Sequence, residues 1–128
     1  MKIGIPKEIK PQEYRIGLTP DSVKTLVSEG HEVIVENNGG FEAGFDNDQY
    51  TNAGAKIAST ASDIFNDAEI IVKVKEPQKV EVNMIRENQI IYTYLHLAAA
   101  EELTEGLIKS KSINIAYETV TDDNGRLP

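Results

Sequence analysis

Four ionisable side chains occupy positions where they could bind and protonate a small carbonyl compound. Lys75 closes one apolar run, His96 ends a second run that contains Tyr94, and Glu118 ends a third. Arg15 lies in the loop after the apolar segment at the start of the chain. A guanidinium group can bind a carboxylate or phosphate through two parallel hydrogen bonds. A lysine can polarise a carbonyl oxygen, and a histidine can transfer a proton near neutral pH.

Each of these residues also has a purely structural interpretation. Arg15 could be a solvated loop arginine. The two-residue period of a strand places Lys73 and Lys75 on the same side. Both could lie at the solvent-exposed end of the strand, or Lys75 could point into a substrate crevice. His96 could be a satisfied, non-catalytic imidazole or a general acid and base.

Two further residues are candidates for supporting roles. Tyr94 shares a face with His96 by strand alternation, but it could be plain core. Glu118 could orient a base, bind water or cap its loop. His31 follows a glycine that stops a helix, at the beginning of a strand, so we interpret it as structural or exposed.

The elements that must position these residues alternate along the whole chain. This alternation predicts an α/β domain with an open, mostly parallel sheet flanked by helices, Rossmann-like or flavodoxin-like but without a dinucleotide-binding motif. The predicted strands cover residues 2–5, 31–36, 55–58, 69–75, 89–95 and 113–119. Three predicted helices begin after Thr19, Asp46, and Ser59 or Thr60. Two more are predicted through Val80, Met84 and Ile85, and over residues 101–109.

Parallel strands explain how residues far apart in sequence could meet. Ligands of open α/β sheets bind outside the carboxyl ends of the strands. Lys75, His96 and Glu118 are predicted at such ends, and Arg15 in the loop after the first strand. We therefore expect all four to reach one rim of the sheet.

Composition excludes several classes of function. The 128 residues carry a net charge of −8, which disfavours a nucleic-acid or anionic-membrane partner held by bulk charge. With 40% hydrophobic residues the chain is predicted to form one globular domain. It has no cysteine, no signal peptide and no apolar stretch long enough for a membrane span, which favours a cytoplasmic location.

Cofactor and metal motifs are missing from the sequence. Gly39, Gly40 and Gly44 do not have the spacing of a dinucleotide-binding loop, and no P-loop or nucleophile elbow occurs. The two histidines make no zinc motif. The sequence therefore predicts a substrate crevice without a cofactor or metal site of its own.

Six sequence blocks carry a resemblance to a known family. They occupy residues 1–8, 14–20, 30–33, 73–77, 94–98 and 116–120, in family order. Together they resemble the N-terminal domain of the alanine dehydrogenase and nicotinamide nucleotide transhydrogenase family, over residues 1 to 128. The blocks at 73–77 and 94–98 look more like the alanine enzyme than the transhydrogenase.

The resemblance implies NAD-dependent, reversible oxidative deamination of L-alanine to pyruvate and ammonium. By position, Arg15 matches the arginine that holds the substrate carboxylate, Lys75 the lysine at the pyruvate carbonyl oxygen, and His96 the general acid and base. It also implies a homo-oligomer, a hexamer, for the complete enzyme.

In the family, an NAD-binding Rossmann domain and a C-terminal return segment follow this domain. Neither is in the 128 residues, so we expect this chain alone to be inactive. Three alternatives stay open: the N-terminal domain of a transhydrogenase α subunit, a truncated stand-alone module that binds a keto or amino acid, and a structural α/β domain whose strand-end charges are only solvated.

Overall fold

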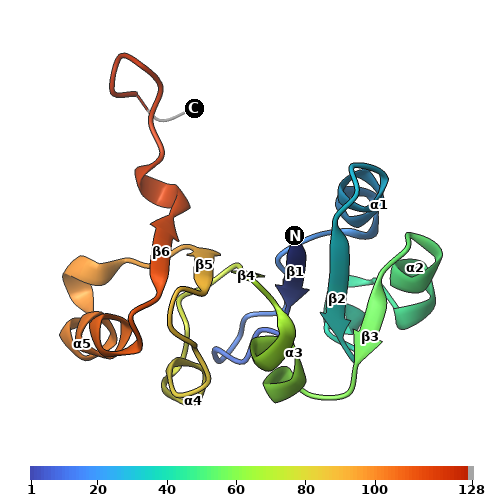
Figure 1. Cartoon of the computed structure of the whole chain (residues 1–128), viewed down its shortest axis with the longest axis horizontal. Helices are drawn as coiled ribbons and strands as arrows, with labels where there is room; N and C mark the ends of the chain where they lie inside the picture. The colour runs from blue at the N-terminus through green and yellow to red at the C-terminus, as the bar shows by residue number, and fades with distance from the viewer. Residues whose placement is uncertain (127–128) are drawn as a thin grey trace.

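The chain forms a six-stranded sheet in which every neighbouring pair of strands is parallel. A computed structural model describes residues 1–126. The strands are β1 (Lys2–Ile5), β2 (Glu32–Glu36), β3 (Lys56–Ala58), β4 (Ile70–Val72), β5 (Ile90–Thr93) and β6 (Ile113–Ala116), in the spatial order β3-β2-β1-β4-β5-β6 (Figure 1). The predicted α/β architecture is confirmed.

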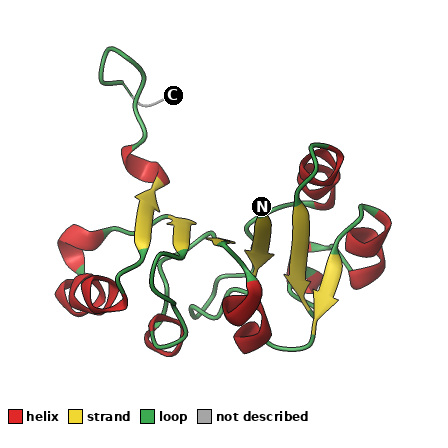
Figure 2. Ribbon diagram, in the orientation of Figure 1, coloured by secondary structure: helices red, strands yellow, loops and turns green. Residues whose placement is uncertain are grey.

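Helices flank the sheet on both faces (Figure 2). They are α1 (Pro20–Ser28), α2 (Asn47–Asn52), α3 (Ala61–Asp67), α4 (Lys79–Val82) and α5 (Glu101–Ser110), with short 3-10 turns at Phe41–Ala43, Leu97–Ala99 and Tyr117–Thr119. One core cluster joins β1 and β2 to Val23 of α1 and Tyr50 of α2. The other joins the opposite face of the sheet to α3 and α5.

Side-chain alternation in the strands assigns residues to these two cores. Ile3 and Ile5 face the α1 and α2 side, while Gly4 between them lies beneath α3. A Cβ atom at Gly4 would lie 2.5 Å from Ile64 Cγ2 and 2.7 Å from the Ala68 Cβ. Glycine at this position therefore lets α3 pack directly on β1.

Local capping explains where two helices begin. The Thr19 side chain accepts a hydrogen bond from the Ser22 N–H, with Pro20 in the first turn of α1. Asp46 and Gln49 form a capping box at the start of α2. Both starts follow the sequence prediction.

Three strands are shorter than predicted. The strands expected over 69–75, 89–95 and 113–119 end at Val72, Thr93 and Ala116. Beyond β4, the backbone N–H groups of Val74 and Lys75 donate to the Glu8 carboxylate instead of to a neighbouring strand. The helix predicted through Ile85 is also shorter, since α4 ends at Val82.

The order of strands reverses between β1 and β4. The chain builds β1, β2 and β3 in one direction, then crosses to β4 and continues through β5 and β6 in the other. The carboxyl ends on either side of such a reversal diverge and leave a crevice, which is where open α/β sheets bind ligands. The loops after β1 and β4 lie on the two sides of this reversal.

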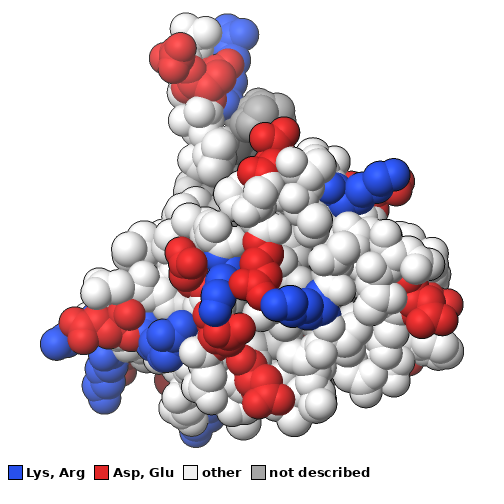
Figure 3. All heavy atoms as spheres, turned by 45° about the vertical axis from the view of Figure 1, so that its right-hand side comes forward, with Lys and Arg blue, Asp and Glu red and all other residues white. Residues whose placement is uncertain are grey.

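The surface carries charges of both signs. On the face drawn in Figure 3, lysines and arginines lie among aspartates and glutamates. After β6, residues 120–126 extend away from the sheet (Figure 1). Within residues 1–126, no helix combines the length and apolar character needed to cross a bilayer.

Substitution of Gly4 by alanine tests the packing of α3 on β1. The added methyl group would overlap Ile64 and Ala68, so we expect a loss of stability of about 1–3 kcal/mol. Urea unfolding of the chain measures this change. An unchanged unfolding midpoint would contradict the close approach.

Candidate functional site

The loop after β1 lies against the end of β4 because residue 17 is glycine. A Cβ atom there would lie only 2.6 Å from the Val72 carbonyl oxygen. The neighbouring Ile16 is buried in the core of β1 and β2, which anchors the loop. Arg15 is thereby carried by a loop that is anchored to the end of β4 and to the core.

Arg15 presents an exposed guanidinium group that Glu13 holds along one edge. Its Nε and Nη2 donate to the two Glu13 carboxylate oxygens at 2.9 and 2.8 Å. These hydrogen bonds lower the pKa of Glu13 to about 2, so its carboxylate is ionised at neutral pH. The Arg15 side chain remains 68% exposed, against 7% for Glu13. Its Nη1 edge points away from this pair and is suited to a second carboxylate.

Lys75 lies in the loop after β4 and is fixed at both ends of its backbone. Its N–H donates to Glu8 Oε1 at 3.0 Å, and its carbonyl oxygen accepts from Thr93 Oγ1 at 2.8 Å. Its Nζ lies 5.1 Å from the centroid of the Tyr94 ring, in cation–π range. The positive charge of Lys75 also lowers the pKa of Glu13, although much less than the hydrogen bond from Arg15 does.

His96 adopts a left-handed backbone conformation, with φ 49° and ψ 47°. A residue with a Cβ atom pays about 1–2 kcal/mol for this conformation. Its ring stacks on Tyr94 at an interplanar angle of 13°, and its Nδ1 is 2.9 Å from Tyr94 Oη. This hydrogen bond leaves Nε2 as the ring nitrogen available to a ligand.

Glu118 holds the strained turn at His96. Its carboxylate accepts the N–H groups of Leu95 at 3.1 Å and of His96 at 2.6 Å. Burial raises the pKa of Glu118, but hydrogen bonds from the backbone N–H groups of His96, Glu118 and Leu95 outweigh it, and the net effect lowers the pKa. Glu118 therefore caps the loop after β5 and not its own loop, and its predicted roles in the site stay predictions.

Tyr117 connects β6 to the loop after β4 and was not predicted from sequence. Its hydroxyl donates to the Val74 carbonyl oxygen at 2.6 Å, and its ring lies 6.4 Å from that of Tyr94. Burial raises the pKa of this phenol, while the nearby Arg15 charge lowers it. Tyr117 thus joins the segment after β6 to the loop that carries Lys75 and to Tyr94.

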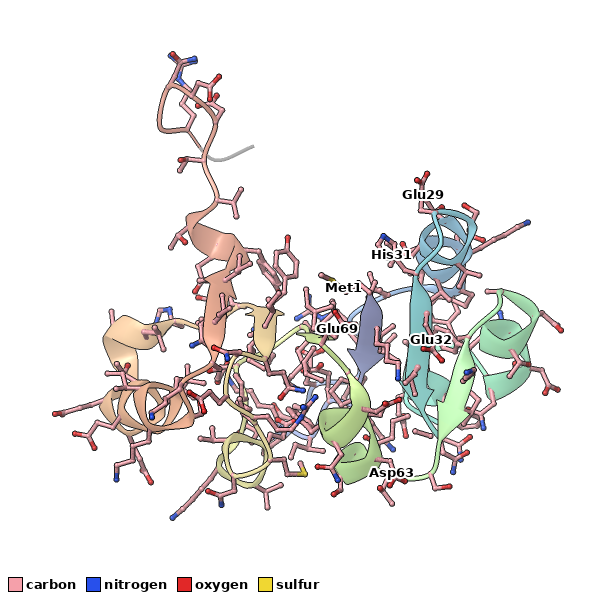
Figure 4. The ribbon with its side chains drawn as sticks, in the orientation of Figure 1. Met1, Glu29, His31, Glu32, Asp63 and Glu69 are labelled. Atoms are coloured by element: carbon pink, nitrogen blue, oxygen red, sulfur yellow. The ribbon has the colours of Figure 1, made fainter. Side chains whose placement is uncertain are left out.

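These contacts link the predicted site residues in one rim. The loop that carries Arg15 lies against the end of β4 at Gly17, Lys75 lies over Tyr94, and Tyr94 stacks on His96. Glu118 fixes the backbone at His96. His31, in contrast, is half-buried at the amino end of β2, beside Met1 and Glu29 in Figure 4.

The prediction that Lys73 lies on a strand face together with Lys75 is wrong. The strand ends at Val72, and Lys73 is buried, with its Nζ 3.2 Å from Glu8 Oε1 and 3.1 Å from Glu81 Oε2. The sequence does carry a signal for this buried pairing, because a lysine next to an apolar parallel strand needs a carboxylate partner when it is buried. Glu8 and Glu81 were also missed, since only the fold brings them to Lys73. The roles of Glu13 and Gly17, which are close to Arg15 in sequence, were missed as well.

No cluster of three or more histidine or acidic residues suited to a metal ion occurs within residues 1–126. The rim instead offers a guanidinium edge, an ammonium group and an imidazole. These groups suit a small anion with a carbonyl or amino group that exchanges protons.

Comparison with known proteins identifies the family. Residues 4–128 match the family described as "Alanine dehydrogenase/PNT, N-terminal domain". An alanine dehydrogenase of Halomonas elongata is 49% identical over 128 residues, which are 100% of this chain and 34% of that protein.

Two solved structures share the fold. An L-alanine dehydrogenase superimposes with a TM-score of 0.97 at 50% identity, covering 100% of this chain and 35% of the other. A transhydrogenase from Sinorhizobium meliloti superimposes with a TM-score of 0.88 at 28% identity, covering 94% of this chain and 36% of the other.

The chain belongs to the alanine dehydrogenase and PNT N-terminal domain family. Within that family it is more similar to the alanine dehydrogenases than to the transhydrogenase. It spans about a third of the length of the relatives that it matches.

Replacing His96 by glycine and by alanine tests the strained backbone. Both changes remove the ring, but only glycine adopts the left-handed conformation without a steric penalty. We therefore expect His96→Gly to be more stable than His96→Ala by about 1 kcal/mol in chemical unfolding. Ala98→Gly, at a residue without positive φ, is the control and should destabilise. If His96→Ala is the more stable variant, the left-handed turn is not formed.

Glu118→Gln tests the loop cap through its pH dependence. Because the folded-state pKa of Glu118 is lowered, its ionised form stabilises the fold fully above its ordinary pKa of 4.5. This stabilisation is lost as the pH falls through the lower, folded-state pKa. The stability difference between wild type and Glu118→Gln should therefore be largest near neutral pH and shrink toward pH 3. Thermal unfolding across this range measures it, and a difference that grows on acidification would contradict the assignment.

Proposed function

We propose that this chain is the substrate-binding domain of an L-alanine dehydrogenase. The reaction converts L-alanine, NAD⁺ and water to pyruvate, ammonium, NADH and a proton, and is reversible. The observation that carries the proposal is that Arg15, Lys75 and His96 lie in the loops after β1, β4 and β5, with Lys75 and His96 both against the Tyr94 ring. The similarity to alanine dehydrogenases over the whole chain supports it.

In the proposed complex, Arg15 binds the carboxylate that alanine and pyruvate share. Glu13 occupies the Nε and Nη2 donors, which holds the guanidinium plane in place. The Nη1 edge then donates to the substrate carboxylate. Because the guanidinium is already ordered by Glu13, less side-chain entropy is lost on binding.

Lys75 and His96 act on the oxygen of the substrate. The ammonium of Lys75 donates to the pyruvate carbonyl oxygen and stabilises the negative charge that develops there when ammonia adds. His96 donates a proton to this oxygen through Nε2 during amination and removes it in the reverse direction. Tyr94 fixes the orientation of the imidazole through Nδ1 and supports Lys75 with its ring face.

The described residues do not fit a dinucleotide. In Rossmann folds the pyrophosphate lies on a glycine-rich turn that opens the first helix. Here the connection from β1 to α1 instead carries Glu8 and Glu13, and α1 begins behind Thr19 and Pro20. We therefore assign the NAD site to residues outside this chain and expect the 128 residues alone to be inactive. A homo-oligomeric, hexameric assembly and a cytoplasmic location remain predictions from the family and the sequence.

Arg15→Ala tests the proposal in the complete gene product. Loss of a charged hydrogen-bond partner of the substrate carboxylate costs on the order of 2 kcal/mol, or about a 30-fold rise in the pyruvate KM. The assay follows NADH oxidation with pyruvate and ammonium, and Lys56→Ala, in a surface ion pair with Glu32, is the control. No activity in the unsubstituted protein, or an unchanged pyruvate KM in Arg15→Ala, would contradict the proposal.

A further inference from the structure

The backbone that carries Lys75 is attached to a buried cluster of charges. Glu8, Lys73 and Glu81 have exposed fractions of 5%, 2% and 1%. They come from the loop after β1, the end of β4 and α4. From this cluster we propose that Glu8 is a positioning residue for catalysis, held by Lys73 and Glu81, which sets the place of Lys75 in the site. This inference rests on the proposed function.

The geometry of Glu8 supports a positioning role. One carboxylate accepts from Lys73 Nζ at 3.2 Å, from the Val74 N–H at 3.1 Å and from the Lys75 N–H at 3.0 Å. It therefore binds one side chain and two consecutive backbone groups. A carboxylate with several fixed donors has little freedom to move, and neither have the backbone groups bound to it.

Lys73 and Glu81 keep that carboxylate in place. Lys73 Nζ forms an ion pair with Glu81 Oε2 at 3.1 Å. The other Glu81 oxygen accepts a hydrogen bond from the Gln78 N–H at the start of α4. Burial raises the pKa of Glu81, while the nearby charge of Lys73 acts in the opposite direction. The cluster thus ties α4 to the loop after β4.

Stability alone does not explain buried charges at this position. Apolar residues of similar size often stabilise a fold at least as well as a buried ion pair. The position of the cluster is informative, because the loop after β1 continues from Glu8 to Arg15 and the loop after β4 continues from Lys73 to Lys75. Glu8 thereby fixes Arg15 and Lys75 relative to each other. These are the residues proposed to donate to the substrate carboxylate and to the substrate carbonyl oxygen.

The distinguishing variant is the double substitution Glu8→Gln with Lys73→Met, made in the complete gene product. It removes the charge that holds the Val74 and Lys75 N–H groups without leaving Lys73 buried and unpaired. Ile64→Val, in the core beneath α3, is the control for a general loss of packing. Thermal unfolding and steady-state kinetics with pyruvate, ammonium and NADH are measured on all three proteins.

A positioning role predicts a folded double variant whose kcat falls about 10-fold or more, with a smaller change in pyruvate KM, because the Lys75 contact matters most as charge develops on the oxygen. Ile64→Val should keep its kcat.

A double variant with unchanged kcat would overturn the inference while leaving the proposed function intact. If the double variant does not fold, Glu8→Asp is tested in its place, because aspartate keeps the charge but has a shorter side chain. A wild-type kcat in Glu8→Asp would overturn the inference. An inactive unsubstituted protein would overturn the proposed function, and the inference with it.

Discussion

The contact between the loop after β1 and the loop after β4 is the constraint on which the candidate site depends. Glu8 joins them through three hydrogen bonds, Lys10 pairs with Glu76, and Gly17 lets the backbone approach Val72. These loops lie at the reversal of strand order between β1 and β4, which is the position where open α/β sheets bind ligands. Without their connection, Arg15 and Lys75 would lie on two independently moving segments.

The other half of the rim depends on backbone strain held by a carboxylate. His96 occupies a left-handed conformation that disfavours side chains, and Glu118 binds the two N–H groups of that turn. Strained residues held by their surroundings concentrate at functional sites. The turn directs the imidazole onto Tyr94 instead of continuing the alternation of β5, so the strain sets the direction of the ring.

Sequence predicted the architecture well because it rests on local signals. Helix starts at Thr19 and Asp46 and the apolar runs of the strands depend on neighbouring residues. The ends of β4, β5 and β6 were predicted too far along the chain, since the residues that stop the ladder are distant in sequence. Glu8 lies more than sixty residues before Lys73, and nothing local announces their pairing.

The candidate site was predicted only in part, because some of its contacts are not announced by neighbouring residues in the sequence. Arg15, Lys75 and His96 were selected from residue type and strand ends, and family resemblance implied their roles. The left-handed turn at His96 and the attachment of Arg15 to Glu13 could not be predicted, because both arise from contacts that depend on backbone geometry. The roles of these residues in catalysis remain proposals.

A pyruvate titration of the isotopically labelled chain, followed by the chemical shifts of its backbone amides, locates the keto-acid site. We expect the largest shifts at residues 13–17, 73–76 and 94–97, around the rim at the ends of β1, β4 and β5. Shifts confined to the groove of about 720 Å³ between α4 and α5, or no saturable shifts at all, would contradict a keto-acid site at this rim.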